Sequence, residues 1–262
     1  MIERIIAYGC SWTAGSELLD HIHMGVSFDE CNSIKQSYMT NGKNLQDMHK
    51  FIEKYNINGA DQLNRDNSWA GLLARRLDKP FINRAQGGAG LDQIYFKLYN
   101  DYLTGDILST DLVLVGLTTP YRAIRFTDNG IVGSLILGHS MRANNPDDVS
   151  LIKLFNDEFA VFHYFKTVKL LHALSDKINI RLQPMVFDIN PYSERFRYTL
   201  QMSRAFVESI WEDCKGIVLL PDDYLRDVMG NGKIKQCGFG HQPLESHIEL
   251  SDKMYNEAIK LL

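Results

Sequence analysis

The sequence predicts a three-layer α/β protein in which helices cover both faces of a five-stranded parallel sheet. The chain has 262 residues, of which 45% are hydrophobic and 23% charged, the proportions of a globular protein with a sizeable core. Short apolar runs alternate with longer segments of helical character, which is typical of parallel strands joined by covering helices. The predicted strands lie at residues 4–8, 80–83, 111–117, 178–187 and 216–220.

The helical pattern is clearest between the third and fourth predicted strands. Apolar residues recur there at steps of three and four from Leu151 to Val168, which predicts a long amphipathic helix. Two further helices are predicted at residues 194–213 and 244–262. An aromatic stripe on the long helix is interpreted as a face packed on the core, and it consists of Phe155, Phe159, Phe162 and Phe165.

Two segments interrupt the alternation of strands and helices. Residues 19–67 are polar and too numerous for a compact crossover, and they hold one predicted helix at 45–55. Loops of this length are commonly functional, so we expect an insertion that covers or shapes a site. Residues 127–148 are rich in Gly, Asn and Asp around an apolar run at 131–137, which indicates a hairpin near the same edge. Without an internal repeat or a Pro/Ser/Gly linker, we expect one domain over residues 1–262 with these two excursions.

The net charge and the hydropathy of the chain argue against nucleic-acid and membrane partners. The chain carries 28 Lys and Arg against 32 Asp and Glu, so its net charge of −4 gives no basic field for nucleic acid. No apolar stretch is long enough to span a membrane, and Glu3 and Arg4 interrupt the first one, so no secretory signal is visible. We therefore expect a soluble, cytoplasmic protein without membrane or nucleic-acid partners. The absence of a C-x-x-C pair predicts reduced thiols at Cys10, Cys31, Cys214 and Cys237.

The first stretch that contains candidate catalytic residues follows the first predicted strand. Residues 9–15 read Gly-Cys-Ser-Trp-Thr-Ala-Gly, which places the Ser11 hydroxyl at the carboxyl edge of a parallel strand, where ligands bind. The Ser11 amide would begin a helix, where a backbone donor and the helix dipole favour an oxyanion. The alternative is that Ser11 only caps the helix. Trp12 either lines a substrate cleft or anchors this helix, and Trp69 has the same two interpretations.

Two other stretches follow predicted strands or precede a helix. Residues 81–90, Phe-Ile-Asn-Arg-Ala-Gln-Gly-Gly-Ala-Gly, form a glycine-rich turn whose amides could approach a bound group. Nucleotide-binding patterns fail here, because Gln93 stands where a dinucleotide fingerprint needs Gly and no Gly-Lys-Ser/Thr follows. Residues 237–243, Cys-Gly-Phe-Gly-His-Gln-Pro, lead into the last helix. A histidine such as His241 is the usual general base, although an isolated loop histidine is more often a surface residue.

In their order along the chain, the three stretches resemble the sequence blocks of the SGNH (GDSL-like) hydrolases. Cys10 stands where that family most often has Asp before the nucleophile, which would be Ser11 here. Asn83 followed by Gly88 is similar to the second block, whose Gly supplies an oxyanion-hole amide. His241 resembles the catalytic His, and the His-x-Pro that it begins, followed by His247, is similar to the last block of many members. The resemblance implies a flavodoxin-like α/β/α fold and a serine hydrolase.

The sequence departs from the family in two places. The third block is Gly-x-Asn-Asp, and residues 115–121 read Val-Gly-Leu-Thr-Thr-Pro-Tyr, so the Asn that donates to the oxyanion is missing. Thr118, Thr119 or Arg122 would supply a replacement donor. Gly238 stands where the family has an Asp three residues before its His. The site is then either a Ser–His dyad or takes its acid from a loop at the same sheet edge, the candidates being Asp188, Asp222 and Asp223.

The resemblance implies cleavage of a carboxylic ester through an acyl-enzyme, without cofactor or metal. Small-molecule or glycan esters are the expected substrates, including acetylated sugars, short-chain esters, lipids and thioesters, with the insertion at 19–67 setting specificity. Two alternatives use the same scaffold: a binding protein that has lost efficient catalysis, and an acyltransferase with the same Ser–His pair. Asp20, His21 and His23 could ligate a metal, but a solvated loop is the favoured interpretation.

Overall fold

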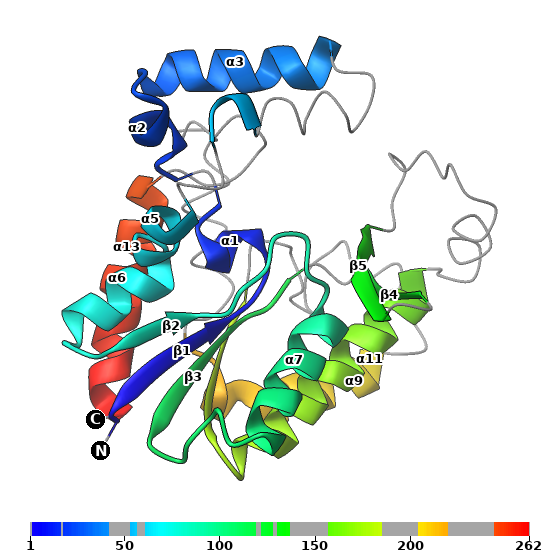
Figure 1. The fold of residues 1–262 in the computed structure, drawn as a ribbon. Helices are drawn as coiled ribbons and strands as arrows, with labels where there is room; N and C mark the ends of the chain where they lie inside the picture. Colours follow the sequence, from blue (N-terminus) through cyan, green and yellow to red (C-terminus); the bar gives the residue numbers. More distant parts are fainter. Residues whose placement is uncertain are drawn as a thin grey trace.

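The computed structural model describes residues 2–16, 18–41, 53–56, 61–118, 122–127, 130–136, 157–184, 204–219 and 244–261. Within these residues, a parallel sheet lies between two layers of helices (Figure 1). The strand order is β2-β1-β3-β6, and every neighbouring pair is parallel. The strands are β1 (Arg4–Tyr8), β2 (Phe81–Asn83), β3 (Asp111–Gly116) and β6 (Asn179–Gln183).

The central strands are buried on both faces, which explains why they read as continuous apolar runs. Because successive side chains of a strand point to opposite faces, β1 divides between two cores. Ile5 and Ala7 belong to one hydrophobic cluster, and Ile6 and Tyr8 belong to the other. Strand β3 continues the same alternation, with Leu112 and Leu114 in the first cluster and Val113 and Val115 in the second.

Each cluster is closed by its own set of helices (Figure 1). The Tyr8 side is covered by α7 (Leu91–Leu103), α9 (Asp157–Ser175) and α11 (Arg204–Cys214). The Ile5 side is covered by α6 (Trp69–Arg76) and α13 (Leu244–Ala258), after which η3 (Ile259–Leu261) follows. In the part of the chain that the structure describes, no helix combines the length and apolar character that crossing a bilayer requires.

The insertion contains more helix than the sequence predicts. It begins with α2 (Asp20–Met24) and the fourteen-residue α3 (Phe28–Asn41), and α5 (Asp61–Asp66) closes it. The prediction of a single helix in this stretch is wrong, because α3 carries few apolar side chains and owes its place to a buried ion pair. Of the helix expected at 45–55, residues 53–54 are helical and 45–52 lie outside the described residues.

The prediction of a fifth strand at 216–220 is also wrong for the described residues. A 3-10 turn, η2 (Lys215–Ile217), occupies the start of this segment, so the chain reaches the edge of β6 only at its end. Val218 forms an isolated parallel bridge with Leu182, whose carbonyl accepts the Leu219 amide at 2.9 Å. The described sheet therefore has four strands. Residue 220 and the end of the expected strand at 178–187 lie outside the described residues.

The hairpin expected from the second excursion is confirmed where it is described. Strands β4 (Arg122–Thr127) and β5 (Gly130–Ile136) pair antiparallel, so the hairpin begins five residues before the predicted segment. Residues 137–148 lie outside the described part. Of the four expected cysteine thiols, Cys10, Cys31 and Cys214 are buried and free of disulfides, and Cys237 is not described.

The aromatic stripe of α9 is only partly a core face. Phe165 is fully buried, but Phe159 and Phe162 are 39% and 45% exposed, so the prediction is wrong for these two residues. The helix turns a neighbouring set of side chains to the sheet, and Phe162 instead stacks on Phe206 of α11 with ring centroids 5.2 Å apart. Phe155 lies outside the described residues. The core positions of α9 are Ala160, Val161, Tyr164, Phe165, Val168, Leu171 and Leu174.

Candidate active site

The strand order fixes where a site can form. The chain passes from β1 to β2 on one side and then returns to β3 on the other, so the order reverses at β1 and β3. In open parallel sheets, ligands bind in the crevice beyond the carboxyl ends of the strands at such a switch point. Ser11 follows β1 and Thr118 follows β3, so both flank this crevice.

Ser11 is the first residue of the short helix α1 (Ser11–Ala14). Cys10 occupies the N-cap position in an extended conformation, and its side chain makes no capping hydrogen bond. The interpretation of Ser11 as the helix cap is therefore wrong, and its hydroxyl is not used in that way. Ser11 is 9% exposed. Gly15 ends α1 with φ of 71°, where a Cβ would lie 2.3 Å from the Asn64 carbonyl oxygen.

Thr13 locks α1 against the ends of two strands. Its side chain is fully buried, and its hydroxyl has no hydrogen-bond partner among the described residues. A Cβ added at Gly9 would lie 2.1 Å from Thr13 Oγ1, and one added at Gly116 would lie 2.0 Å from it. Glycine at both positions thus lets α1 approach β1 and β3 closely, which sets the place of Ser11.

The glycine-rich turn after β2 lies directly beside Ser11. The Arg84 amide donates to the Ala7 carbonyl at 2.8 Å, and the Gln86 amide donates to the Gly9 carbonyl at 3.0 Å. A Cβ at Gly87 would lie 4.0 Å from Ser11 Cβ. Gly88 has φ of 77°, and a Cβ there would meet nothing within 4 Å, so this residue borders open space. The second motif is therefore brought next to the first.

Side chains from outside the turn hold its shape. Asn83 Nδ2 donates to the Thr13 carbonyl at 2.9 Å, while Asn83 Oδ1 accepts the Ala85 amide at 3.0 Å. Arg65 Nη1 of α5 donates to the carbonyls of Asn83 and Ala85 at 3.0 and 2.7 Å. Lys97 Nζ of α7 donates to the Arg84 carbonyl at 2.9 Å, and burial lowers the pKa of this ammonium group.

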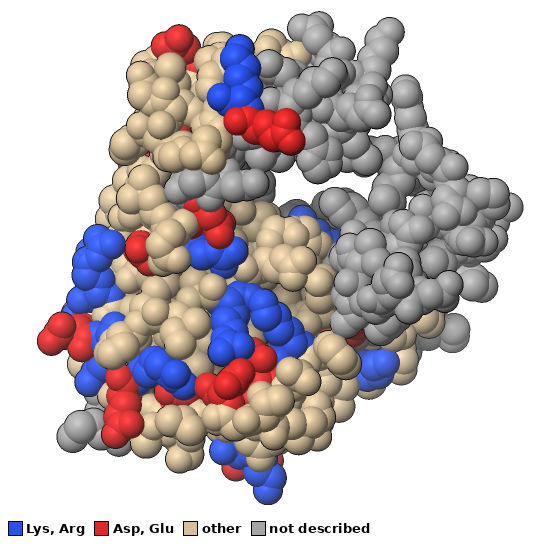
Figure 2. Space-filling view, viewed as in Figure 1, with Lys and Arg blue, Asp and Glu red and all other residues tan. Residues whose placement is uncertain are grey.

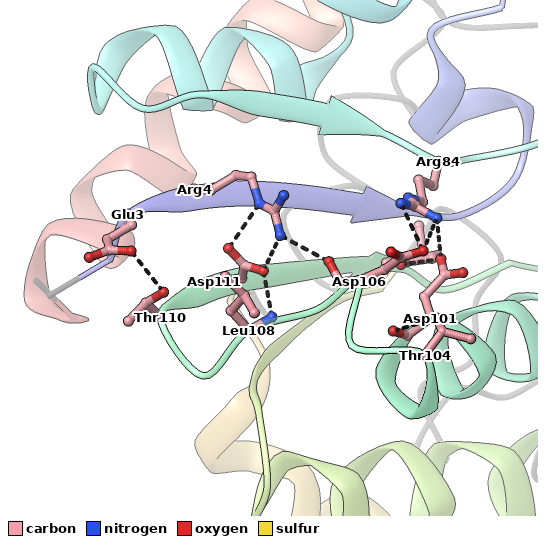
Figure 3. A network of polar contacts seen from close by, with 10 residues as sticks. Glu3, Arg4, Arg84, Asp101, Thr104, Asp106, Leu108, Thr110 and Asp111 are labelled. Carbon is pink, nitrogen blue, oxygen red and sulfur yellow. Dashed lines mark hydrogen bonds and ion pairs between the residues drawn. The ribbon is translucent and has the colours of Figure 1, made fainter.

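A polar network anchors the base of the same turn to α7 (Figure 3). Arg84 Nη1 donates to Asp101 at 2.9 Å, and the Tyr8 hydroxyl donates to the same carboxylate oxygen at 2.6 Å. Burial, followed by the hydrogen bond to Asp101, raises the pKa of Tyr8 above its usual range. Basic and acidic side chains interleave on the face that Figure 2 shows, so these charges are locally balanced.

The loop after β3 brings Arg122 to the glycine-rich turn. Thr118 is fully buried, and its Oγ1 accepts a hydrogen bond from Arg122 Nη1 at 3.2 Å. The same nitrogen donates to the Ala89 carbonyl at 3.4 Å, one residue beyond Gly88. Two of the expected replacement donors, Thr118 and Arg122, therefore contact each other where the missing Asn was expected, and the third, Thr119, lies outside the described residues.

Trp12 points away from open solvent and into the core beneath α6 and α13. It is 7% exposed, and its ring meets the His247 ring edge-on with centroids 6.0 Å apart. His247 Nδ1 accepts the backbone amide of Trp69 at 2.9 Å, which places the proton of neutral His247 on Nε2. Trp69 is fully buried. The structure thus places both tryptophans in the hydrophobic cluster on the Ile5 side of the sheet.

In the cluster of Asp20, His21 and His23, the first and last side chains form hydrogen bonds with other residues of the insertion. Asp20 accepts hydrogen bonds from Lys35 and Asn64, and His23 Nε2 lies 2.8 Å from the Asn56 carbonyl. Burial lowers the pKa of His21, against an opposing effect of Asp20. Among the residues described, no group of three or more His, Cys, Asp or Glu could hold a metal.

Several residues that position the site were not found from the sequence. Arg65 donates to backbone carbonyls of a segment far away in the chain, and no local pattern marks it. His247 was named from the sequence only as part of the last block, and its role as the acceptor of the Trp69 amide was not predicted. Ser68 does carry a signal, because a serine before an apolar helix predicts an N-cap, and it accepts from Gly71 and Asn83. The expected His241, Asp188, Asp222 and Asp223 lie outside the described residues.

The site therefore consists of a serine at the carboxyl end of a central parallel strand, with a glycine turn beside it. Solved structures similar to this chain are lipolytic proteins of the G-D-S-L family and esterases. The Veillonella parvula G-D-S-L protein is 11% identical, with TM-score 0.47 over 99% of this chain and 98% of its own. The psychrotrophic esterase EstA from Pseudoalteromonas sp. is 13% identical, with TM-score 0.48 over 99% and 98%. No protein-family model matches the sequence, and no curated protein does.

Proposed function

We propose that the chain is a serine hydrolase that cleaves a carboxylic ester through an acyl-enzyme. The observation that carries the proposal is the position of Ser11, with the Gly87–Gly88 turn beside it at the switch point of the sheet. A nucleophile there has backbone amides of two loops next to it, as oxyanion stabilisation requires. The order of the sequence motifs supports the same conclusion.

In the proposed reaction, Ser11 Oγ attacks the ester carbonyl while His241 takes its proton. The negative oxygen of the tetrahedral intermediate is stabilised by the amides of Ser11 and Gly88. The intermediate collapses by breaking the bond to the alcohol, which receives the proton from His241. Water, deprotonated by His241, then attacks the acyl-enzyme, releasing the acid and restoring Ser11.

The Thr118 hydroxyl is our proposed third donor to the oxyanion. Because its Oγ1 already accepts from the Arg122 guanidinium, its own proton is left to donate elsewhere. A hydroxyl that accepts from a cation is a stronger donor, since hydrogen bonds in a chain polarise one another. Thr119 is the neighbouring candidate for the same role. Asp188 is our first choice for the acid that orients His241, with Asp222 and Asp223 as alternatives.

Covalent labelling tests the nucleophile directly. The purified protein is treated with a fluorophosphonate and weighed intact, and hydrolysis of 4-nitrophenyl acetate is followed in parallel. The wild type should gain one adduct and turn over the ester, whereas Ser11→Ala should gain none and lose turnover by about a thousandfold or more. Ser109→Ala, which changes an exposed serine at the opposite edge of the sheet, should behave as the wild type.

The outcomes separate the candidate functions. A wild type that neither labels nor hydrolyses esters would overturn the hydrolase proposal and favour a binding role on the same scaffold. Labelling at Ser11 without release of acid, but with transfer to an added alcohol, would identify an acyltransferase. If Ser11 is confirmed, His241→Gln and Asp188→Asn would then test the base and the acid, with small-molecule and acetylated glycan esters as substrates.

A further inference from the structure

We propose that Arg122 binds an anionic group of the substrate, so that the preferred ester carries a carboxylate or phosphate near the bond that is cleaved. This inference deepens the proposed function and rests on it for the place of the reacting ester. It follows from three observations about Arg122: its position, the nitrogen atom that it uses in hydrogen bonds, and its unbalanced charge.

Two uncharged oxygen atoms hold Arg122 at the carboxyl edge of the sheet. Nη1 donates to Thr118 Oγ1 and to the Ala89 carbonyl, which belong to the loops after β3 and β2. The guanidinium is therefore fixed between the loop that precedes the hairpin and the turn that borders Ser11. A cation held by uncharged partners at this position remains available to a third group.

The remaining edge of the guanidinium can donate two parallel hydrogen bonds to one ligand. Both hydrogen bonds come from Nη1, which leaves the edge formed by Nε and Nη2. Nε is buried and has no hydrogen-bond partner among the described residues. A buried donor without a partner is costly, and two parallel N–H groups match the two oxygens of a carboxylate or phosphate.

The charge of Arg122 is not compensated within the described part of the chain. The arginines that form ion pairs there are Arg4, Arg65, Arg76 and Arg84, each with an aspartate. Among the residues that the structure describes, no carboxylate forms an ion pair with Arg122. Because a partly desolvated guanidinium without a counterion attracts an anion strongly, an anionic substrate would supply the missing partner.

The test compares two esters with the same leaving group. 4-Nitrophenyl hydrogen glutarate carries a carboxylate at the end of its acyl chain, and 4-nitrophenyl butyrate carries none. The wild type should favour the anionic ester in kcat/KM, and Arg122→Gln should lower the ratio of the two kcat/KM values by roughly ten- to a hundredfold. Arg75→Gln removes an exposed arginine of α6 and should leave the ratio unchanged.

Binding without turnover provides an independent measurement. Glutarate and inorganic phosphate should each raise the melting temperature of the wild type more than that of Arg122→Gln, and uncharged glutaramide should raise neither. Glutarate and phosphate together distinguish a carboxylate site from a phosphate site. If the wild type is inert toward both esters but binds either anion through Arg122, the hydrolase proposal fails, and the part of this inference that assigns anion binding to Arg122 holds.

Two results would overturn the inference. One is hydrolysis of both esters at a ratio that Arg122→Gln does not change. The other is the absence of any Arg122-dependent stabilisation by glutarate or phosphate in a protein that hydrolyses neither ester. In the first case, the proposed function would stand without it.

Discussion

Three small residues determine how closely the nucleophile approaches the sheet. Thr13 fills the space between Gly9 and Gly116, and each glycine leaves no room for a Cβ. The two positions differ in the atom that a Cβ would meet. At Gly116 the severe contact is with Thr13 Oγ1 alone, and Thr13 Cβ lies 3.3 Å away, whereas at Gly9 a Cβ would also lie 2.5 Å from Thr13 Cβ.

This difference predicts which substitution can be rescued. Gly116→Ala should lower the free energy of unfolding by about 1–3 kcal/mol through overpacking. Adding Thr13→Ala removes the clashing oxygen, so the double variant should recover most of that loss. Gly9→Ala should be destabilising as well, but Thr13→Ala should not rescue it because Thr13 Cβ remains. Urea denaturation of the single and double variants measures all three effects.

Ester hydrolysis by the same variants gives a second readout. A displaced α1 moves Ser11, so Gly116→Ala should lower kcat more than it raises KM, and the rescued double variant should regain kcat. Equal rescue of both glycine variants by Thr13→Ala would show that the packing described here does not decide the position of α1.

Buried charges hold the helices of the insertion to one another. Lys35 of α3 donates to Asp20 of α2 at 2.8 Å, and both side chains are almost completely buried. Asn64 of α5 donates to the other Asp20 oxygen at 2.7 Å and accepts the Leu19 amide at 2.7 Å. Three helices thus meet at one carboxylate. Removing either charge alone leaves the other buried without its partner.

Lys35→Met should therefore destabilise the insertion by about 3–5 kcal/mol, because the Asp20 carboxylate loses its counterion in a buried place. Hydrogen exchange should become faster across α2 and α3 before the sheet is affected. Lys35→Met combined with Asp20→Asn removes both charges and should recover part of the protection. Lys177→Met changes an exposed lysine and is the matched control. Unchanged exchange in Lys35→Met would show that this ion pair does not hold the insertion.

The same helices show why sequence patterns predicted some elements and missed others. Strands β1 and β3 are buried on both faces, so their apolar runs are unmistakable, and both were predicted to within one residue. Helix α3 is fixed by a polar contact to α2, and no hydrophobic periodicity marks it. The fifth expected strand failed because an apolar run does not reveal that the chain enters it through a 3-10 turn.

The segment from Asn64 to Trp69 connects the parts of the site that lie far apart in the sequence. Asn64 holds the insertion, Arg65 and Ser68 hold the glycine turn through Asn83, and the Trp69 amide is bound by His247. Ser11 and the glycine turn could be located from the sequence, because each follows a strand within one local motif. The contacts of Arg65 with the Asn83 carbonyl and of His247 with the Trp69 amide could not be predicted, because each joins a side chain to a backbone atom, 18 and 178 positions away respectively.

The stability of the folded protein should depend on alkaline pH through Tyr8, which joins β1, α7 and the base of the glycine turn. Burial and the hydrogen bond to Asp101 raise the pKa of Tyr8 above its ordinary value of 10.0. At neutral pH, Tyr8→Phe should cost about 1.5–3 kcal/mol, because a hydrogen bond to a charged group is lost.

The sign of the pH dependence follows from which state keeps the proton. Above about pH 10, Tyr8 ionises in the unfolded chain and stays protonated in the folded one, so the unfolded state binds fewer protons and stability falls. The contribution of Tyr8 to the free energy of unfolding is complete below its ordinary pKa and is lost as the pH rises toward the raised value.

The difference in free energy of unfolding between the wild type and Tyr8→Phe should therefore shrink by up to about 1.4 kcal/mol per pH unit. Urea unfolding of both proteins from about pH 7 to about pH 11 measures this difference, and the other tyrosines cancel because both proteins share them. A difference that stays constant with pH would mean that Tyr8 ionises equally easily in the folded and unfolded states.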